Sequence, residues 1–313
     1  MSKIAVMTDS NAGLTQEMGE KLGIKIVPMP FFIDGEEYLE GVTLDQKQFF
    51  EMLDKGAKVS TSQPAIGMVT SMWDELLEEN DYVVYFPMSS GLSKSCETAT
   101  IASHSDEYEG KVFVIDNGRI SVPQAQAVFD CQEMIKKGLN IHTIVKVLEE
   151  TGMNHDIFLM LDTLDYLKRG GRITPTAAAL GGFLKLKPVL MIKGEKLDSY
   201  RMRNRTIDGA KKIMKEACLK CIEGYMKDID GDTSNIHFEV AYSGTDTTEA
   251  LAFVEEIKSE FGIKNVDMLQ LSLSIACHTG PGALGMAVSK AIPNDIKDDI
   301  IIEKNDEILK ELR

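Results

Sequence analysis

Long hydrophobic runs are missing from this sequence of 313 residues, although 43% of the residues are hydrophobic. No apolar run approaches the ~18 residues that a transmembrane helix needs. The apolar stretch at residues 4–7 is also too short for a signal peptide and is typical of a first strand. We therefore expect a cytoplasmic protein without stable insertion into a membrane.

An excess of basic residues is missing too. The sequence has 34 Lys plus Arg against 49 Asp plus Glu, which gives a formal net charge of −15. This balance argues against a nucleic-acid partner and against docking on an anionic membrane, because both attract positive surfaces. The ordinary alternative is that the acidity only keeps the protein soluble.

Cysteine is scarce and lacks the spacing of a disulfide framework. The five cysteines are an odd number, which favours reduced thiols in a cytoplasm. Cys218 and Cys221 form a C-x-x-C pair, but they lie within an expected helix, and no second ligand pair accompanies them. The sequence therefore predicts neither a metal site nor a cofactor.

The first half of the chain alternates between two patterns of apolar residues. Short apolar, often β-branched segments alternate with helical ones, which predicts a doubly wound, mainly parallel sheet. An Asp34-Gly35 turn adds a hairpin over residues 33–38. The strands are expected at residues 4–8, 25–32, 82–88 and 111–116, and the helices at 15–22, 44–55, 67–79, 93–103 and 123–137.

The pattern changes near residue 150 and predicts a C-terminal α/β domain with a mixed sheet. Residues 187–193 and 196–202 flank Gly194 like an antiparallel pair, and Gly170-Gly171 ends a helix over 164–169. Further helices are expected at 141–150 and 207–226, strands at 157–161, 237–242 and 266–275, and a charged helical tail at 295–313.

These patterns favour two domains, each with its own core. We place the N-terminal domain at residues 1–153 and the C-terminal domain at 154–313. The helix over residues 64–79 can pack on either domain.

Three turns rich in hydroxyls and glycine carry most of the chemistry. They supply neutral hydrogen-bond donors, small residues that admit a ligand, and one histidine, which suits a bound carboxylate better than a metal or a nucleic acid. Each follows a strand-like apolar run. The turns span residues 60–64, 89–95 and 278–285.

The turn at residues 89–93 holds Ser90, Gly91 and Ser93 and leads from an expected strand into a helix. Its backbone N–H groups, its hydroxyls and the positive end of the helix dipole point at one place. An alternative stays open, because Ser90 or Ser93 can simply cap the helix, as can Ser62 in the earlier turn.

His278 ends the strand-like run at residues 271–277, and the glycines after it allow close approach of the backbone. Residues 280–285 match G-x-G-x-x-G, but the match lies near the C-terminus and Pro281 lacks a donor, so we reject a dinucleotide site. Arg169 and Arg172 lie beside the end of an expected helix. Their positive charges can simply stabilise the helix dipole, or they can bind a phosphate or an acidic partner.

Six motifs in order resemble those of the DegV family, the fatty-acid-binding proteins that carry lipid for bacterial fatty acid kinase. The resemblance spans roughly residues 3–290. The motifs are Thr8-Asp9-Ser10, Ser60-Thr-Ser-Gln-Pro64, Ser89-Ser-Gly-Leu-Ser93, Leu167-Lys-Arg-Gly-Gly-Arg-Ile173, Lys187-Pro-Val-Leu190 and Gly280-Pro-Gly-Ala-Leu-Gly285.

The resemblance implies a two-domain α/β fold with one long-chain fatty acid in a tunnel and its carboxyl group near the domain junction. Thr61 and Ser93 match the positions that bind the carboxyl group, with Ser62, Ser90 and Gly91 beside them. The positions near the exposed head group are Arg169, His278 and Gly282.

The partner implied by the resemblance is an ATP-dependent kinase, which phosphorylates the bound acid to an acyl phosphate for phospholipid synthesis. The chain itself is then a carrier and not an enzyme. One departure from the family pattern is Lys94-Ser95, where the family usually has Gly-Thr after the serine.

Two other functions compete with the carrier. A serine acyl hydrolase would use a serine of the turn at 89–93 as nucleophile and His278 as base, but the sequence has no G-x-S-x-G motif and no evident acidic partner. A structural protein would use the turns only as helix caps.

For the carrier, the candidate residues of the tunnel wall are Phe31, Phe32, Leu92, Ile101, Phe158, Leu180 and Phe183.

Overall fold

The computed structural model describes residues 2–179, 186–226, 235–293 and 296. Leu180 and Phe183 lie outside the described residues, and so does the expected helical tail, except for Ile296.

The N-terminal part is built on a four-stranded parallel sheet in the order β2-β1-β6-β7. Successive side chains of a strand face opposite sides. Val84 and Phe86 therefore pack beneath α5 and α6, whereas Val83 and Tyr85 pack with α3 and α4. Helices on both faces confirm the doubly wound parallel sheet. The elements are β1 (Ile4–Asp9), α1 (Gln16–Leu22), β2 (Ile24–Val27), α3 (Ile66–Leu77), β6 (Tyr82–Phe86), α4 (Ser95–Ser103), β7 (Val112–Val114), α5 (Val122–Lys136) and α6 (Ile141–Thr151).

A second, three-stranded antiparallel sheet corrects two predictions. The single strand expected at residues 25–32 is split, because Pro28 and Pro30 lack the N–H groups that would continue the parallel ladder. Thr61, expected in a turn, instead pairs with Phe31 in this sheet. Asp34 and Gly35 both have positive φ and confirm the hairpin turn. The elements are β3 (Pro30–Ile33), β4 (Glu36–Leu39), α2 (Gln46–Asp54) and β5 (Val59–Thr61).

The C-terminal part confirms the predicted mixed sheet. Its order is β10-β9-β8-β13-β11-β12, and only β11 and β12 pair in parallel. Phe158, Met160 and Phe238 point from one face toward α9 and α10. The elements are β8 (His155–Met160), α7 (Asp165–Gly170), α8 (Pro175–Ala179), β9 (Val189–Ile192), β10 (Asp198–Arg201), α9 (Ile207–Met226), β11 (Ile236–Tyr242), α10 (Thr248–Phe261), β12 (Asp267–Gln270), α11 (Leu273–Thr279) and β13 (Leu284–Lys290).

The strand predicted at residues 266–275 is wrong in its second half, and so is the placement of His278 at a strand end. β12 ends at Gln270, and the Ser272 hydroxyl then accepts the N–H of Ile275 and caps α11, which carries His278. β13, an inner strand of the sheet, was not predicted; the expected glycine turn overlaps only its first two residues.

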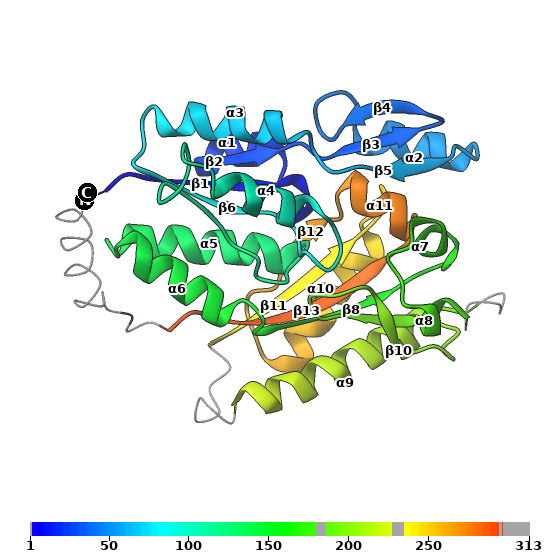
Figure 1. The fold of residues 1–313 in the computed structure, drawn as a ribbon. Helices are drawn as coiled ribbons and strands as arrows, with labels where there is room; N and C mark the ends of the chain where they lie inside the picture. Colours follow the sequence, from blue (N-terminus) through cyan, green and yellow to red (C-terminus); the bar gives the residue numbers. More distant parts are fainter. Residues whose placement is uncertain (1, 180–185, 227–234, 294–295, 297–313) are drawn as a thin grey trace.

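The two parts of the chain pack closely against each other. Figure 1 shows α5 between the two large sheets, with α9 along the far side of the C-terminal sheet. Phe31 and Phe49 share a hydrophobic cluster with Leu273 and Cys277 of α11. The boundary at residues 153–154 falls between α6 and β8, and it stays a prediction. The helix expected over 64–79 packs on the four-stranded sheet.

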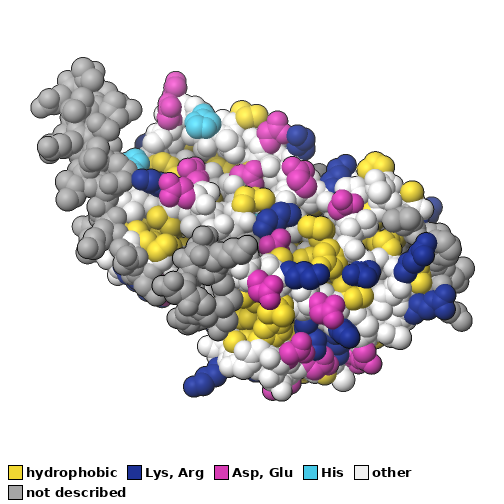
Figure 2. Space-filling view, turned by 90° about the horizontal axis from the view of Figure 1, so that it is seen from below, with side chains coloured by type: hydrophobic (Ala, Val, Ile, Leu, Met, Phe, Trp, Pro, Cys, Tyr) yellow, Lys and Arg dark blue, Asp and Glu magenta, His cyan; other side chains and the backbone are white. Residues whose placement is uncertain are grey.

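The outer surface of the C-terminal part carries charges of both signs. Figure 2 shows Lys and Arg side chains interspersed with Asp and Glu on this face. Lys211 and Lys215 of α9, for example, pair with Glu256 of α10. Within the described part of the chain, no helix has the length and hydrophobicity to cross a membrane.

Candidate functional site

A cavity of about 290 Å³ lies where the two parts meet. One wall is the face of the six-stranded sheet that turns away from α9. The opposite wall consists of the loops that follow the parallel strands β1, β6 and β7, a usual position for a ligand in such a sheet. Most of the lining is apolar and includes Met88, Leu92, Ile157, Leu159, Leu167 and Ile192.

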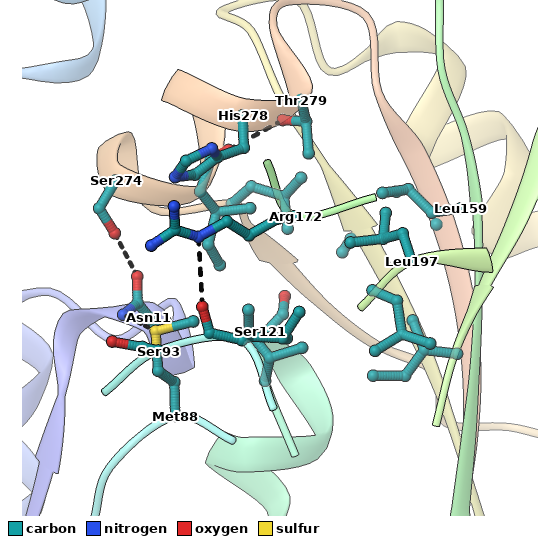
Figure 3. A pocket seen from close by; sticks show the side chains of 18 of the residues that line it. Asn11, Met88, Ser93, Ser121, Leu159, Arg172, Leu197, Ser274, His278 and Thr279 are labelled. Carbon is teal, nitrogen blue, oxygen red and sulfur yellow. Dashed lines mark hydrogen bonds between the residues drawn. The ribbon is translucent and has the colours of Figure 1, made fainter. Parts of the chain in front are cut away.

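Polar side chains gather on one side of this cavity. Figure 3 shows Ser93, Arg172 and His278 there, and Leu159 and Leu197 on the other side. The cavity is therefore amphipathic, with an apolar body and a polar end.

Thr61 belongs to this polar end. Its hydroxyl oxygen lies 2.9 Å from Nε2 of His278, and Ser62 lines the cavity beside it. Of the predicted site residues, the structure thus brings together Thr61, Ser62, Ser93 and His278.

α11 is held in place by the N-terminal part of the chain. Asn11 Oδ1 accepts hydrogen bonds from the hydroxyls of Ser272 and Ser274. The Glu40 carboxyl group accepts the N–H of Leu273, a free donor of the first helical turn. Burial raises the pKa of Glu40 to about 7, although the Ser10 hydroxyl and the Leu273 N–H both donate to its carboxyl group. His278 is therefore carried on a helix that both parts of the chain position.

His278 is neutral at physiological pH. Burial, helped by the nearby Arg172 guanidinium, lowers the pKa of His278 to about 4. Its Nδ1 has no hydrogen-bond partner and lies against the backbone of Gly170, where an added Cβ would be only 1.9 Å away. The imidazole is thus wedged between α7 and Thr61.

Ser90 and Gly91 do not line the cavity. Ser90 is exposed, and the Gly91 backbone packs so closely on Gly194 that an added Cβ would lie 2.2 Å from the Gly194 carbonyl oxygen. Ser89 donates to that same oxygen, so this part of the turn joins the two halves of the chain. Ser93 lines the cavity and also accepts the N–H of Ser95.

Arg169 and Gly282 also lie outside the cavity. Arg169 is exposed, with its guanidinium 4.8 Å from the centre of the Tyr166 ring. Gly282 lines a second cavity of about 310 Å³ together with Asp162. The arginine that lines the first cavity is Arg172, which donates to the carbonyl oxygens of Gly170 and Leu92.

Sequence reasoning missed several polar residues of the lining, among them Arg172, Asn11 and Ser274. Arg172 belongs to the same basic motif as Arg169, and its only signal was that motif. Asn11 gave no signal apart from its position in a turn after the first strand, and Ser274 lay inside an expected strand.

Most of the predicted wall residues lie elsewhere, with Leu92 as the exception. Phe31 packs against Phe49, and Phe158 faces α9 on the far side of the sheet. Ile101 is 70% exposed on α4. Phe32 is half-buried in β3 without reaching the cavity.

The geometry does not favour a hydrolase. A serine–histidine pair needs the hydroxyl within hydrogen-bond reach of the imidazole and a third group that orients it. His278 instead contacts Thr61, and its second nitrogen has no partner. In the described part of the chain, no three His, Cys, Asp or Glu residues cluster as metal ligands would.

Comparison with known proteins places the chain. The family model described as "Uncharacterised protein, DegV family" matches residues 3–291. The chain belongs to the DegV family.

Three relatives illustrate this DegV membership. A DegV domain-containing protein of Staphylococcus aureus is 29% identical over 297 residues, which are 93% of this chain and all of the relative. A Thermus thermophilus DegV family protein, described by its fatty acid binding, is 29% identical with a TM-score of 0.82, over 92% of this chain and 99% of that one. A stearic acid-binding protein of Eubacterium ventriosum is 27% identical with a TM-score of 0.81, over 92% and 98% of the two chains.

Proposed function

We propose that this DegV family chain binds one long-chain fatty acid in the 290 Å³ cavity, with the carboxyl group at the polar end. The observation that carries the proposal is the division of the cavity into an apolar body and a hydroxyl-rich end. The fatty acid binding named for the Thermus and Eubacterium proteins supports it, because both share this fold over nearly their whole length.

The apolar body suits an acyl chain. Each buried methylene group contributes ~0.8 kcal/mol, so a sixteen-carbon chain gains on the order of 10 kcal/mol before the cost of immobilisation. Only an enclosed apolar lining collects that energy. The sheet supplies one in Ile157, Leu159 and Ile192.

The carboxylate needs donors once it leaves water. In the proposed complex Thr61 and Ser93 donate their hydroxyl hydrogens to the carboxylate oxygens. Neutral His278 assists, because an Nε2–H that donates to the Thr61 oxygen leaves the Thr61 hydroxyl hydrogen directed at the ligand. Arg172 adds positive potential nearby without needing a direct bond.

We propose further that the bound acid is presented to a partner, an ATP-dependent fatty acid kinase. A carboxylate oxygen would attack the terminal phosphorus of ATP, the bond from that phosphorus to the bridging oxygen would break, and ADP would leave with an acyl phosphate as product. Arg169 is exposed beside the polar end and is free to contact the partner or its phosphates. This chain would act in the cytoplasm and supply phospholipid synthesis.

The first test is mass spectrometry of an organic extract of the protein purified without added lipid. We expect about one fatty acid per chain. An empty extract, together with no uptake of added palmitate or oleate, would overturn the proposal.

The second test compares two serines of one turn. Ser93→Ala should weaken fatty-acid binding by about 1.5–3 kcal/mol, the worth of a hydrogen bond to a charged group. Ser90→Ala should keep the affinity, because Ser90 is exposed outside the cavity. Equal affinities would remove Ser93 from the site while leaving the cavity assignment intact.

A further inference from the structure

Ser121 is a residue of the cavity wall whose conformation calls for an explanation. It directly precedes α5 and has φ 60° and ψ −139°, a backbone conformation that glycine adopts readily and serine rarely. A serine at this position usually accepts an N–H of the helix that follows. The Ser121 side chain makes no such cap.

The Ser121 hydroxyl is also buried without a partner. The residue is 6% exposed, lines the cavity, and its Oγ has no hydrogen bond. Leaving a hydroxyl unsatisfied inside a protein weakens the fold, and such groups commonly mark a functional site. Figure 3 shows Ser121 across the pocket from Leu159 and Leu197, where an acyl chain would pass.

Glu239 of β11 adds a second polar group to the same lining. It is fully buried, and its carboxyl oxygens each lie 3.1 Å from the Ser289 hydroxyl. Burial raises the pKa of Glu239 to about 8, although the Arg119 guanidinium acts in the opposite direction. The group is therefore mostly protonated at neutral pH and can both donate and accept.

Glu239 lies away from the proposed carboxyl end. Strand pairing puts Glu239, Ala287 and Ile157 in one row across the sheet, two residues from the row of Ala241 and Leu159. That is a step of about 7 Å along the strands. The second row is the one nearer to α11, since Leu271 bonds to the next residue, Tyr242.

Arg119 links the two groups in space. Its charge acts on Glu239, and it lies two residues before Ser121 in the loop that enters α5. Ser121 and Glu239 thus reach the cavity from opposite walls, the α5 loop and the sheet.

We propose that Ser121 and Glu239 form a second polar site within the tunnel, which binds an oxygen function carried part-way along the acyl chain. The favoured ligands then include hydroxy fatty acids. The inference rests on the proposed function, since it assumes a fatty acid in this cavity.

The experiment measures dissociation constants for stearic, 10-hydroxystearic and 12-hydroxystearic acid by displacement of a fluorescent fatty acid. A hydroxyl group carried into a purely apolar tunnel would lose its bonds to water and weaken binding about tenfold or more. We expect at least one hydroxy acid to bind the wild-type protein within threefold of stearic acid.

The decisive variant is Ser121→Gly, which removes the hydroxyl and suits the positive φ. It should raise the ratio of the hydroxystearic to the stearic dissociation constant about tenfold. Glu239→Leu, which removes both the donor and the acceptor, should raise the same ratio, whereas Glu239→Gln keeps a donor and an acceptor and should stay near the wild-type ratio. Ser105→Gly, an exposed serine outside the cavity, should leave the ratio unchanged.

Three outcomes would overturn the inference. Both hydroxy acids binding at least tenfold more weakly than stearic acid would show a purely apolar tunnel and leave the proposed function standing. If neither Ser121→Gly nor Glu239→Leu changed the ratio measured for the wild-type protein, the hydroxyl group would be bound by other residues. Failure of all three acids to bind would overturn the proposed function, and the inference with it.

Discussion

The hydroxyl oxygen of Thr61 lies 2.9 Å from Nε2 of His278, although 217 positions separate the two residues in the sequence. Thr61 ends β5 of the small antiparallel sheet, and His278 lies near the end of α11. This hydrogen bond joins the two parts of the chain at the polar end of the cavity.

Thr61→Val replaces the hydroxyl by a methyl group of nearly the same size. The fatty-acid affinity should fall about tenfold, because the carboxylate loses a donor inside a largely desolvated site. Isothermal titration calorimetry with palmitate measures the change. Thr248→Val, on the exposed surface of α10, is the matched control and should bind like the wild-type protein. Equal affinity of the two variants would contradict the role of Thr61.

Arg169 and Arg172 should separate lipid binding from the partner reaction. Arg172→Ala should weaken fatty-acid binding, because Arg172 lines the cavity and its charge faces the proposed carboxylate. Arg169→Ala should keep lipid binding and slow acyl-phosphate formation with the kinase and ATP, since Arg169 is exposed outside the cavity. Both rates and affinities are needed. Loss of lipid binding in Arg169→Ala would contradict this division.

Gly170→Ala should disturb His278 without touching the cavity directly. The added Cβ would lie 1.9 Å from Nδ1 of His278, so the imidazole or α7 must move. Overpacking of this kind costs about 1–3 kcal/mol of folding free energy, and displacing His278 from Thr61 should also lower fatty-acid affinity. Urea denaturation and lipid titration test both effects.

Gly67→Ala is the control for this substitution. Gly67 also lies in a helix, but an added Cβ meets nothing within 4 Å, and alanine is the better helix former. Its stability should hold or rise by up to ~1 kcal/mol. If Gly170→Ala also kept its stability and its fatty-acid affinity, the close contact between Gly170 and His278 would contribute nothing to either.

Glu239 should make stability depend on pH in a defined direction. Its pKa in the folded protein is about 8, above its ordinary value of 4.5, so the folded chain keeps a proton that the unfolded chain has lost. The free energy of unfolding therefore falls as pH rises from 4.5 to 8, by on the order of 4 kcal/mol from this group.

Glu239→Gln removes this contribution, because an amide does not titrate. The wild-type protein should lose stability relative to the variant between pH 5 and pH 8, as measured by urea denaturation at each pH. A stability difference that stays constant over this range would show that Glu239 does not change its protonation on unfolding.

The parallel sheet and the helices of the N-terminal part were predictable because their signals are local. Strands such as β1 and β6 are short apolar runs between clear breaks, and the Asp34-Gly35 turn carries its own conformational signature. α11 could not be predicted in this way, because the alternating residues Leu271-Ser-Leu-Ser274 fit a strand as well as a capped helix. Tertiary contacts with Asn11 and Glu40 favour the helix.

The site was predictable only at the level of segments. The hydroxyl turns and the basic motif do reach the cavity region, but neighbouring residues in each point in different directions. Ser93 lines the cavity while Ser90 is exposed, and Arg172 lines it while Arg169 stacks on Tyr166. Which member of each pair faces the cavity depends on how the two parts of the chain pack. A local sequence pattern does not predict that packing.

α11 is fixed at its start by Asn11 and Glu40 and near its end by Thr61, all from the first 61 residues. Neither half of the chain therefore contains the cavity by itself, and ligand affinity includes the free energy of holding the halves together. A ligand that binds only the joined form strengthens that association. Conversely, a substitution at a distant point of the junction, such as the contact of Ser89 with Gly194, can weaken binding without altering one residue of the cavity wall.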